Sequence, residues 1–570
     1  MRYFALASDY DGTLAHHGAV EDSTIDALKR VRDSGRKLLL VTGRELPELQ
    51  MIFPQLDLFD SVVVENGALL YTPSTKKEQV LADPPPERLI SALRGRGIDR
   101  LSVGRVIVAT WEDYKSTVLE VVNELGLELQ LIFNKGALMI LPSGVNKASG
   151  LAAALEAMCL SRHNVAGIGD AENDHAFLSL CECGVAVANA LPALKERADV
   201  VMNGVAGEGV RELIDSLLKD DLRSYAPRLS RYDILLGTDE AGQKVCVHPY
   251  GTSLMVAGTS GGGKTTLTTG FLERLTEAKY QFCVIDPEGD YQNFTGAVVL
   301  GDTKNSPTVN EILSVLETPS EQVIVNLVGI DLDKRPEFFD TLLPRLHEMR
   351  SRTGRPHWII IDEAHHLLPA SWQPSTITIP KEMTSMMLIT LEPDHVAPSM
   401  LACVNTLVAV GKNPEETIRK FSGAANLATP DMQPVELKRG EVLLWGAKDG
   451  RPPVRVKIQP GAAQSSRHAR KYAAGELPPD RSFYFRGPEG KLNLRAQNLV
   501  MFLQLMDGVD EETWLYHLRR RDYSRWFLEE IKSDDLSAAT ADIEGRRGLS
   551  AAESRGLIRE EIQRRFTLPA

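Results

Sequence analysis

A glycine-rich segment in the middle of the chain has the spacing of a phosphate-binding loop. It reads G-x-x-x-x-G-K-T, with Gly258, Gly263, Lys264 and Thr265 at the defining positions. An apolar run precedes it and a helix-compatible segment follows, which is the strand–loop–helix context that a phosphate cradle requires. We therefore predict a nucleotide site, in which the lysine reaches the β- and γ-phosphates and the threonine hydroxyl binds Mg²⁺. The residues expected to bind the nucleotide are Gly258, Ser260, Gly261, Gly262, Gly263, Lys264, Thr265 and Thr266.

Two adjacent acids end a later apolar run, residues 358–361. Asp362 can order the water shell of Mg²⁺, and Glu363 can polarise the water that attacks the γ-phosphate. A kinase does not need the second carboxylate as a water activator, whereas an NTP hydrolase does. The pair therefore favours hydrolysis.

A second set of acids lies near the N-terminus, where Asp9 and Asp11 follow an apolar run at 4–8. Residues i and i+2 of a strand share a face, so both side chains can meet one phosphate group. One ionised carboxylate can attack phosphorus to form an aspartyl-phosphate, while the other handles the proton of the leaving group. This spacing predicts phosphoester chemistry at a strand end.

Three later segments offer groups that suit the same chemistry. Thr42 follows an apolar run at 37–41, Lys147 stands at the start of a predicted helix, and Asp170 and Asp174 follow another apolar run. Carboxylates can hold Mg²⁺ beside a phosphoester, while lysine and threonine compensate the charge on the phosphoryl oxygens. We expect these residues to meet Asp9 in one site.

These four segments, in this order, resemble the motifs of the haloacid dehalogenase (HAD) superfamily of aspartate phosphatases. The resemblance implies that Asp9 is the nucleophile and Asp11 the general acid and base. It also implies that Thr42 and Lys147 bind the phosphoryl group. A Rossmann-like domain is the implied fold.

The same resemblance implies a metal site and a cap. The Mg²⁺ ligands would be Asp9, the backbone carbonyl of Asp11 and Asp170, with Asp174 supporting them. The spelling V-V-V-E-N-G-A further along resembles the branch that acts on sugar phosphates and similar small phosphoesters. That branch inserts an α/β cap between the second and third motifs, and residues of about 80–142 are available for a small one.

The sequence of this segment names no substrate. Four of its residues have side chains that could line the substrate-facing side, and these are Arg105, Trp111, Tyr114 and Lys115. Ordinary cap surface or cap core is the stronger interpretation of all four.

The module around the glycine loop alternates strands and helices, which predicts a largely parallel sheet. It resembles the HerA/FtsK-like ATPases, hexameric motors that move DNA. Residues 234–242 resemble their lead-in strands, 286–291 their loop after the second strand, and 440–446 their closing strand. The resemblance implies ATP as the nucleotide, a homo-oligomer that can be a hexamer, and DNA as a partner.

The module departs from that family after its fourth strand. Such ATPases usually carry a polar sensor in a Thr-Gln-Arg-Pro-like sequence, whereas this chain has Leu391 and Glu392 between Thr390 and Pro393. No arginine finger is assigned, because each arginine available is more readily a surface charge. The candidates are Arg345, Arg352, Arg355 and Arg419. His365 and His366 lack further ligands at metal-site spacing, so we interpret them as supporting or packing groups.

Length and composition limit the remaining possibilities. The chain has 570 residues, which is enough for three or four domains. Its content of 43% hydrophobic and 25% charged residues is typical of a globular protein. It has no apolar run long enough to cross a membrane and no signal-peptide pattern at its start, and its six cysteines form no C-x-x-C pair. We expect a cytoplasmic protein. The net charge of −13 argues against a generally basic nucleic-acid coat.

The stretch at 513–527 interleaves aromatic residues with arginines and could bind phosphates or single-stranded nucleic acid. A core formed by Trp514, Leu518 and Trp526 is the favoured alternative. Apolar residues recur at helical spacing in residues 494–505, which predicts a helix.

The predicted fold class is α/β multidomain, with a Rossmann-like HAD domain and small α/β cap, a parallel-sheet P-loop domain and a helical C-terminal domain. The predicted boundaries are 1–220 for the HAD domain, 221–230 for a linker, 231–457 for the P-loop domain, 458–481 for a second linker and 482–570 for the helical domain.

Three functional hypotheses follow. In the favoured one, an ATP-hydrolysing oligomer acts on nucleic acid, while a Mg²⁺-dependent phosphatase removes phosphate from a nucleotide, a polynucleotide end or a small metabolite. In the second, the phosphatase acts on a sugar phosphate or another small phosphorylated metabolite, and the P-loop module is an ATP-dependent regulator. The third, a polynucleotide kinase–phosphatase, is weaker because the acid pair at 362–363 favours water as the acceptor.

Overall fold

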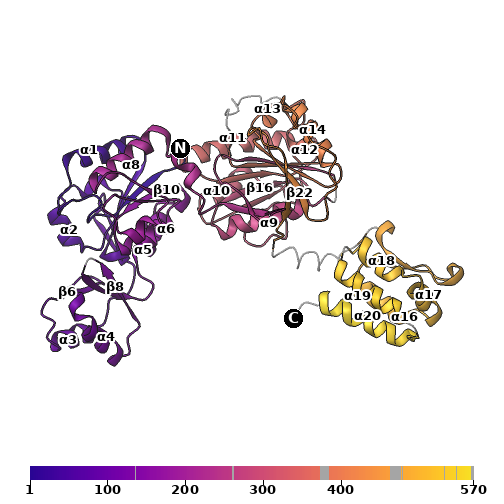
Figure 1. Cartoon of the computed structure of the whole chain (residues 1–570), viewed down its shortest axis with the longest axis horizontal. Coiled ribbons are helices and arrows are strands. Elements are labelled where there is room, and N and C mark those ends of the chain that lie inside the picture. Colours follow the sequence, from indigo (N-terminus) through magenta and orange to yellow (C-terminus); the bar gives the residue numbers. More distant parts are fainter. Residues whose placement is uncertain are drawn as a thin grey trace. The chain divides into compact units, whose positions relative to one another are not determined.

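A computed structural model of the chain describes residues 1–134, 136–259, 262–372, 384–461, 477, 479–531, 533–546 and 548–566. The chain forms two compact units, whose helices and strands Figure 1 shows. The larger unit comprises Met1–Thr265 and Arg274–Gln459, and the smaller comprises Thr266–Glu273 and Pro460–Ala570. No helix among the described residues is both long and apolar enough to cross a membrane.

The first half of the larger unit is a Rossmann-like domain. Among the described residues, its sheet has eight strands in the order β12-β11-β10-β1-β2-β3-β4-β5, and β12 to β3 run parallel. The strands are β1 (Ala5–Ser8), β2 (Lys37–Val41), β3 (Ser61–Val64), β4 (Leu69–Thr72), β5 (Lys77–Val80), β10 (Val165–Gly169), β11 (Cys183–Ala186) and β12 (Val200–Val201). The helices are α1 (Asp22–Asp33), α2 (Leu46–Ile52), α5 (Lys147–Ala157), α6 (His175–Leu180), α7 (Pro192–Lys195) and α8 (Gly207–Asp220).

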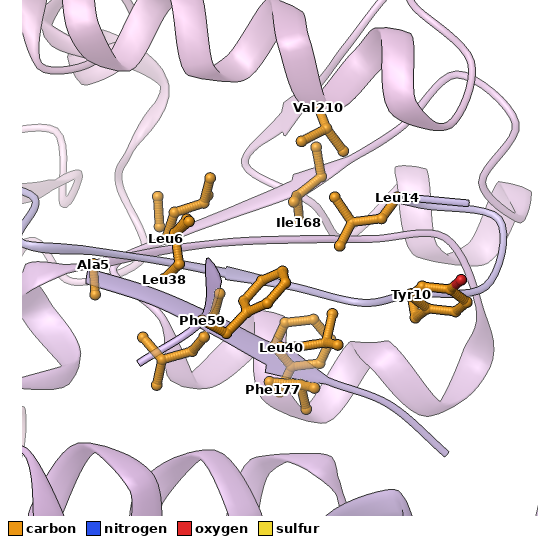
Figure 2. Close-up of a cluster of buried hydrophobic side chains, with 14 of the residues drawn as sticks. Ala5, Leu6, Tyr10, Leu14, Leu38, Leu40, Phe59, Ile168, Phe177 and Val210 are labelled. Carbon is orange, nitrogen blue, oxygen red and sulfur yellow. The ribbon is translucent and has the colours of Figure 1, made fainter. Parts of the chain in front are cut away.

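Helices cover both faces of this sheet, with α1 and α8 on one side and α5 and α6 on the other (Figure 1). The central strands are therefore mostly apolar on both faces rather than alternating. Figure 2 shows the result: Leu6 and Ile168 lie on the face toward Val210 of α8, whereas Ala5 points to the opposite face. All four side chains are fully buried.

A small α/β cap follows β5, as the sequence predicts. Its four strands, counted among the described residues, form an antiparallel sheet in the order β6-β7-β9-β8, backed by two helices. Its elements are α3 (Glu87–Gly95), β6 (Ser102–Val103), β7 (Val108–Trp111), α4 (Lys115–Glu124), β8 (Leu129–Asn134) and β9 (Ala137–Pro142). Buried Glu65 of the core accepts hydrogen bonds from three successive backbone N–H groups of the cap, those of residues 105–107, at 2.8, 2.8 and 3.0 Å. The cap is thereby fixed to the core at this point.

The second half of the larger unit is the P-loop domain. Across the described residues its sheet has 11 strands, in the order β14-β13-β23-β22-β21-β15-β20-β19-β16-β18-β17. The strands from β21 to β17 are parallel, and the other four are antiparallel. The strands are β13 (Ile234–Asp239), β14 (Lys244–Val247), β15 (Ser253–Gly258), β16 (Phe282–Asp286), β17 (Val298–Leu300), β18 (Val323–Asn326), β19 (Trp358–Ile361), β20 (Met386–Thr390), β21 (Thr406–Val410), β22 (Glu441–Gly446) and β23 (Val454–Ile458). The helices are α9 (Lys264–Glu277), of which residues 266–273 belong to the smaller unit, α10 (Val309–Leu316), α11 (Arg335–Thr353), α12 (Ala364–Leu367), α13 (Pro398–Leu401) and α14 (Pro414–Ala424).

A buried polar network joins the two halves of the larger unit. Glu182 of the first half accepts hydrogen bonds from Arg2 at 2.5 Å and from Tyr280, which precedes β16, at 2.9 Å. His163 contacts Glu182 through Nδ1 at 2.6 Å and the backbone carbonyl of Ala278 through Nε2 at 2.8 Å. Burial alone would raise the pKa of Glu182, but these hydrogen bonds and charges outweigh it and lower the pKa. We call this set of five residues the joint.

The smaller unit is mainly helical. A two-stranded sheet of β24 (Phe483–Phe485) and β25 (Leu494–Ala496) packs with α16 (Leu499–Gly508), α17 (Glu511–Arg519), α18 (Asp522–Glu529), α19 (Asp534–Gly545) and α20 (Ala551–Phe566). The predicted helix at 494–505 is therefore wrong at its start. Residues 494–496 pair as a strand, and the Asn498 side chain caps the helix by accepting from the Met501 N–H. Trp514, Leu518 and Trp526 are buried, which confirms the core interpretation for these three residues.

Candidate active sites

The sheet of the first half brings the predicted phosphatase residues to one edge. Asp9 follows β1, Thr42 follows β2 and Asp170 follows β10, and these are three adjacent parallel strands. The carboxyl ends of parallel strands form the usual crevice for ligands in such sheets. Lys147 is the first residue of α5, whose start is fixed by a capping box between Asn146 and Ser149.

A buried charge cluster forms the floor of this site. Lys147 Nζ donates to Asp9 Oδ1 at 2.6 Å and to Asp174 Oδ1 at 2.5 Å. Oxygens of Asp9, Asp170 and Asp174 lie within 4.8 Å of one another, and all three residues are buried. Asp174 also accepts the backbone N–H groups of Asp170 and Ala171, which fixes its orientation. The four residues thus form one rigid cluster.

The pKa values in this cluster reflect burial and crowding of charge. Burial and the neighbouring charge of Asp174 raise the pKa of Asp9, against the opposing effect of Lys147. Burial disfavours the charged ammonium of Lys147, but Asp174 and Asp9 outweigh this and raise its pKa. Lys147 pairs with two of the three clustered carboxylates, those of Asp9 and Asp174, and Asp170 brings a third acidic group into the same buried space.

Asp11 lies at the edge of the cluster and is held by a residue that the sequence analysis did not assign. Arg44 Nε and NH2 donate to the two Asp11 carboxylate oxygens, each at 2.7 Å, and NH1 contacts Glu48. Arg44 follows Thr42 by two residues, and its backbone N–H donates to the Thr42 hydroxyl at 3.2 Å. Thr42 itself is fully buried. The sequence Thr-Gly-Arg at 42–44 places Arg44 two residues after the predicted phosphate-binding threonine, and this position could have indicated its role.

A cavity of about 690 Å³ lies between the charge cluster and the cap. The core supplies Asp9, Asp11 and Lys147 to its lining, and the cap supplies Arg100 and Trp111. Trp111 is thus the one of the four cap candidates that lines the cavity. Tyr114 packs against the cap core, Lys115 stacks over the Phe133 ring at 4.9 Å, and Arg105 pairs with Glu78 at 3.5 Å.

The phosphate-binding loop lies at the end of β15, at the middle of the second sheet. Gly258 has φ +140°, and a Cβ at this position would lie 2.0 Å from the backbone oxygen of Val410, so only glycine fits. Gly262 likewise approaches the backbone of Gly411, and Gly263 adopts φ +98° directly before α9. Ser260 and Gly261 lie outside the described residues. Thr266 is in the first turn of α9.

The two functional side chains of the loop are both engaged. Lys264 Nζ donates to the backbone carbonyl of Gly258 at 2.9 Å. Burial lowers the pKa of Lys264, while the nearby acids Glu363, Asp362 and Asp290 oppose that effect. The Thr265 hydroxyl donates to Asp290 Oδ2 at 3.3 Å.

The acid pair follows β19, two strands from β15 in the sheet. Asp362 is buried, and its Oδ1 accepts the Glu363 backbone N–H at 2.9 Å. Burial, with help from neighbouring acids, raises the pKa of Asp362 to about 7. Glu363 has left-handed backbone geometry, φ +41°, and burial also raises its pKa. Strained residues of this kind are common at functional sites.

The structure adds Asp286 and Asp290 to this site. The Asp286 carboxylate accepts backbone N–H groups from Gly289, Asp290 and Tyr291 at 2.8, 3.1 and 2.8 Å. These bonds fold the segment after β16 so that Asp290 reaches Thr265. The pattern of this segment gives no signal for the contact that Asp290 makes across the sheet edge.

The prediction that Arg355 is a surface charge is wrong. Arg355 is buried and is neither a surface charge nor available to another molecule. Its guanidinium donates to Gln281 Oε1 at 3.1 Å and to the backbone carbonyls of Leu316 and Cys159 at 2.9 and 3.1 Å. It therefore stabilises the contact between the two halves of the larger unit.

Comparisons with known proteins agree with both halves of this arrangement. Residues 6–93 and 105–214 match the haloacid dehalogenase-like hydrolase family, and residues 248–395 match an AAA domain family. Phosphoglycolate phosphatase 2 of Saccharolobus solfataricus is 30% identical over 220 residues, which are 37% of this chain and 91% of that protein. The phosphoglycolate phosphatase of Methanothermobacter thermautotrophicus is 31% identical over 218 residues, or 37% and 96% of the two chains. A haloacid dehalogenase-like hydrolase structure from Bacteroides thetaiotaomicron has 20% identity and a TM-score of 0.34, covering 38% of this chain and 99% of that one.

Proposed function

Because the chain belongs, through residues 6–93 and 105–214, to the haloacid dehalogenase-like hydrolases, we propose that its first half is a phosphatase with Asp9 as nucleophile. The Asp9 carboxylate attacks phosphorus, the ester P–O bond breaks, and Asp11 gives its proton to the leaving oxygen. Water then attacks the aspartyl-phosphate, passes a proton to Asp11 and releases phosphate. Lys147 fixes Asp9 and offsets the charge that accumulates on the phosphoryl oxygens. The observation that carries the proposal is the Lys147 bridge between Asp9 and Asp174 on the cavity floor.

The residues present fit a divalent cation. Asp9, Asp170 and Asp174 are buried and bring oxygens within 4.8 Å of one another, and two of them, Asp9 and Asp174, pair with the Lys147 ammonium. Carboxylate oxygens are the ligands that Mg²⁺ prefers, and a cation would offset the negative charge that three carboxylates concentrate here. These carboxylates would hold Mg²⁺, which supplies further positive charge beside the phosphoryl group.

The cavity favours a small phosphorylated metabolite as substrate. Its lining includes the carboxylates of Glu45, Glu48 and Asp99 beside the indole of Trp111. Acidic side chains repel the phosphate backbone of nucleic acid, so we now prefer a small molecule to a polynucleotide end. The relatives named phosphoglycolate phosphatases make 2-phosphoglycolate the first compound to test. The hydroxyl-binding carboxylates and the exposed indole favour a sugar phosphate as the second.

For the second half, we propose ATP hydrolysis. Lys264 and the loop would bind the phosphates, Thr265 and Asp362 would hold Mg²⁺, and Glu363 would polarise the attacking water. The joint between the halves supports the hypothesis that ATP turnover regulates the attached phosphatase. A DNA-moving ring of HerA/FtsK type is the second candidate, favoured by the folded 286–291 segment and its contact with Thr265.

One set of assays separates these proposals. Phosphate release from 2-phosphoglycolate, hexose phosphates, nucleotides and a 3′-phosphorylated oligonucleotide is measured with and without ATP. ATP turnover and particle mass are measured with and without DNA. A phosphatase rate that changes with ATP, in a protein indifferent to DNA, supports the regulator. Strong DNA stimulation of a hexamer-sized particle supports the ring motor. Absence of phosphate release from every substrate would contradict the phosphatase proposal.

A further inference from the structure

The end of β20 lies between the phosphate-binding loop and the acid pair. Thr390 is the last residue of this strand and aligns with Ala257 of β15, one residue before the start of the loop. On its other side β20 pairs with β19, which leads into Asp362 and Glu363. A side chain at this position can therefore connect the nucleotide loop with the acid that polarises water.

Thr390 is hydrogen-bonded to His365, and the direction of the bond follows from the available hydrogens. The Thr390 Oγ1 lies 3.2 Å from the backbone carbonyl of Glu392 and 3.1 Å from His365 Nδ1. A hydroxyl has one hydrogen, and the carbonyl can only accept, so the hydroxyl donates to Glu392. The His365 Nδ1–H must then donate to the Thr390 oxygen. We assign the Nδ1–H tautomer on this basis.

The same nitrogen also faces the catalytic acid. His365 Nδ1 lies 3.4 Å from Glu363 Oε2, and the two side chains are only 15% and 16% exposed. Burial lowers the pKa of His365 to about 4, so the ring is neutral at physiological pH. Its single Nδ1–H is donated to the Thr390 oxygen, and Glu363 Oε2 is a longer contact of the same nitrogen rather than a second hydrogen bond. The imidazole therefore stands between the hydroxyl that ends β20 and the carboxylate that follows β19.

The polar sensor that the resemblance implies directly after β20 is missing. Neither residue that follows this strand takes its place. Leu391 carries no hydrogen-bonding side chain and is 37% exposed. Glu392 is paired with Lys420. Among the described residues, His365 brings one nitrogen within 3.1 Å of the Thr390 hydroxyl and within 3.4 Å of the Glu363 carboxylate.

We propose that His365 is a positioning residue for ATP hydrolysis, which ties Glu363 to Thr390 at the end of β20 and orients the Glu363 carboxylate toward the attacking water. The inference rests on the proposed ATPase function of the second half. Misplacing a catalytic group by 1 Å can cost about 100-fold in rate, so loss of this tie should act on turnover rather than on nucleotide affinity.

The test compares two substitutions of His365 in the full-length protein. In asparagine the side-chain nitrogen is attached to Cγ, as Nδ1 is in histidine, so His365→Asn can keep the donor while His365→Phe removes it. We expect His365→Phe to lower kcat for ATP by about 10- to 100-fold with KM and nucleotide affinity within about 3-fold, and His365→Asn to restore kcat to within about 3-fold of the wild type.

Two further variants complete the test. His366→Phe changes the exposed neighbouring histidine and should keep the wild-type kcat. Thr390→Val should lower kcat and leave KM unchanged. The double variant with His365→Phe should have about the same kcat as His365→Phe, because both substitutions remove the same contact. Phosphatase activity and thermal unfolding of each variant report whether the fold is retained.

The outcomes distinguish the inference from the proposed function. Equal kcat in wild type and His365→Phe, or equal losses in the phenylalanine and asparagine variants, would overturn the positioning role. Additive effects of the Thr390→Val and His365→Phe substitutions would also overturn it. Wild-type ATP turnover no faster than that of a Glu363→Gln variant would instead overturn the ATPase proposal on which the inference rests.

Discussion

The two candidate sites use a lysine in opposite ways. Lys147 in the first half is buried and held by two carboxylates, those of Asp9 and Asp174. Lys264 in the second half donates to a backbone carbonyl, and its acidic neighbours act on it only through longer-range charge. One site is therefore fixed by mutual ion pairing within its floor, and the other by the backbone of a glycine-rich loop. The difference predicts that the same kind of substitution will have unequal consequences in the two halves.

The largest contrast is expected for the lysines themselves. Lys147→Met leaves Asp9 and Asp174 buried without their cation, and breaking a buried pair costs about 3–5 kcal/mol. Phosphatase activity should fall at least about 1,000-fold, because the nucleophile loses its orientation and charge compensation. Lys264→Met removes a single hydrogen bond to a carbonyl and should cost about 1 kcal/mol while abolishing ATP binding. Urea unfolding of both variants measures the contrast, and equal destabilisation would contradict it.

The response to Mg²⁺ should separate the halves next. Asp170→Asn removes one carboxylate of the buried cluster, so phosphatase activity should fall about 100-fold or more and thermal stabilisation by Mg²⁺ in the absence of nucleotide should be lost. ATP turnover should not change. Differential scanning calorimetry with and without Mg²⁺ provides the check. Undiminished stabilisation of Asp170→Asn would show that the cation binds elsewhere.

A smaller effect is expected at the edge of the phosphatase cluster. Arg44→Gln removes the paired hydrogen bonds that orient Asp11, and we expect kcat of the phosphatase to fall about 10- to 100-fold. Because Arg44 acts through Asp11, the loss should be smaller for substrates with good leaving groups, which need no proton. The comparison of 4-nitrophenyl phosphate with an alkyl phosphate tests this. A uniform loss for both would assign Arg44 to substrate binding instead.

The smallest predicted effect is a pH dependence of stability in the second half. Burial and the charge of Arg350 lower the pKa of His347 to about 4, whereas an unfolded histidine titrates near pH 6.5. Between these values the unfolded chain binds more protons, so the stability that His347 contributes is complete above pH 6.5 and is lost as the pH falls toward 4. His347→Leu should therefore lose less stability between pH 7 and pH 5 than the wild type does. Denaturant midpoints of both proteins at pH 7 and pH 5 measure this. An equal decrease of the midpoint in the wild type and in His347→Leu would contradict the prediction.

The grouping of the motif residues into two sites could be predicted from the sequence, because most of these residues follow an apolar strand. Parallel strands bring such ends together, so Asp9, Thr42 and Asp170 could be placed in one site without coordinates. The same reasoning placed the phosphate loop and the acid pair on one sheet. What it missed depends on contacts across loops. Asp290 reaches Thr265 only because the Asp286 carboxylate folds the intervening turn.

The joint was missed for a related reason. Glu182 and Tyr280 are 98 positions apart, and neither carries a pattern that marks it as a partner of the other. Arg355 was interpreted as a surface charge because arginine usually is one, whereas it is buried and its guanidinium donates to four oxygens of the protein. Buried polar contacts of this kind depend on tertiary packing, which residue type and spacing do not encode.

The central claim is that one chain carries two separate hydrolytic centres, and paired assays of Asp9→Asn and Glu363→Gln test it most directly. Phosphatase activity is measured without ATP and ATP turnover without phosphatase substrate, in the full-length wild type and both variants. We predict that Asp9→Asn loses phosphatase activity at least about 1,000-fold and keeps ATP turnover. Glu363→Gln should lose ATP turnover about 100-fold and keep phosphatase activity. Loss of both activities from either substitution, or wild-type ATP turnover in Glu363→Gln, would contradict the claim.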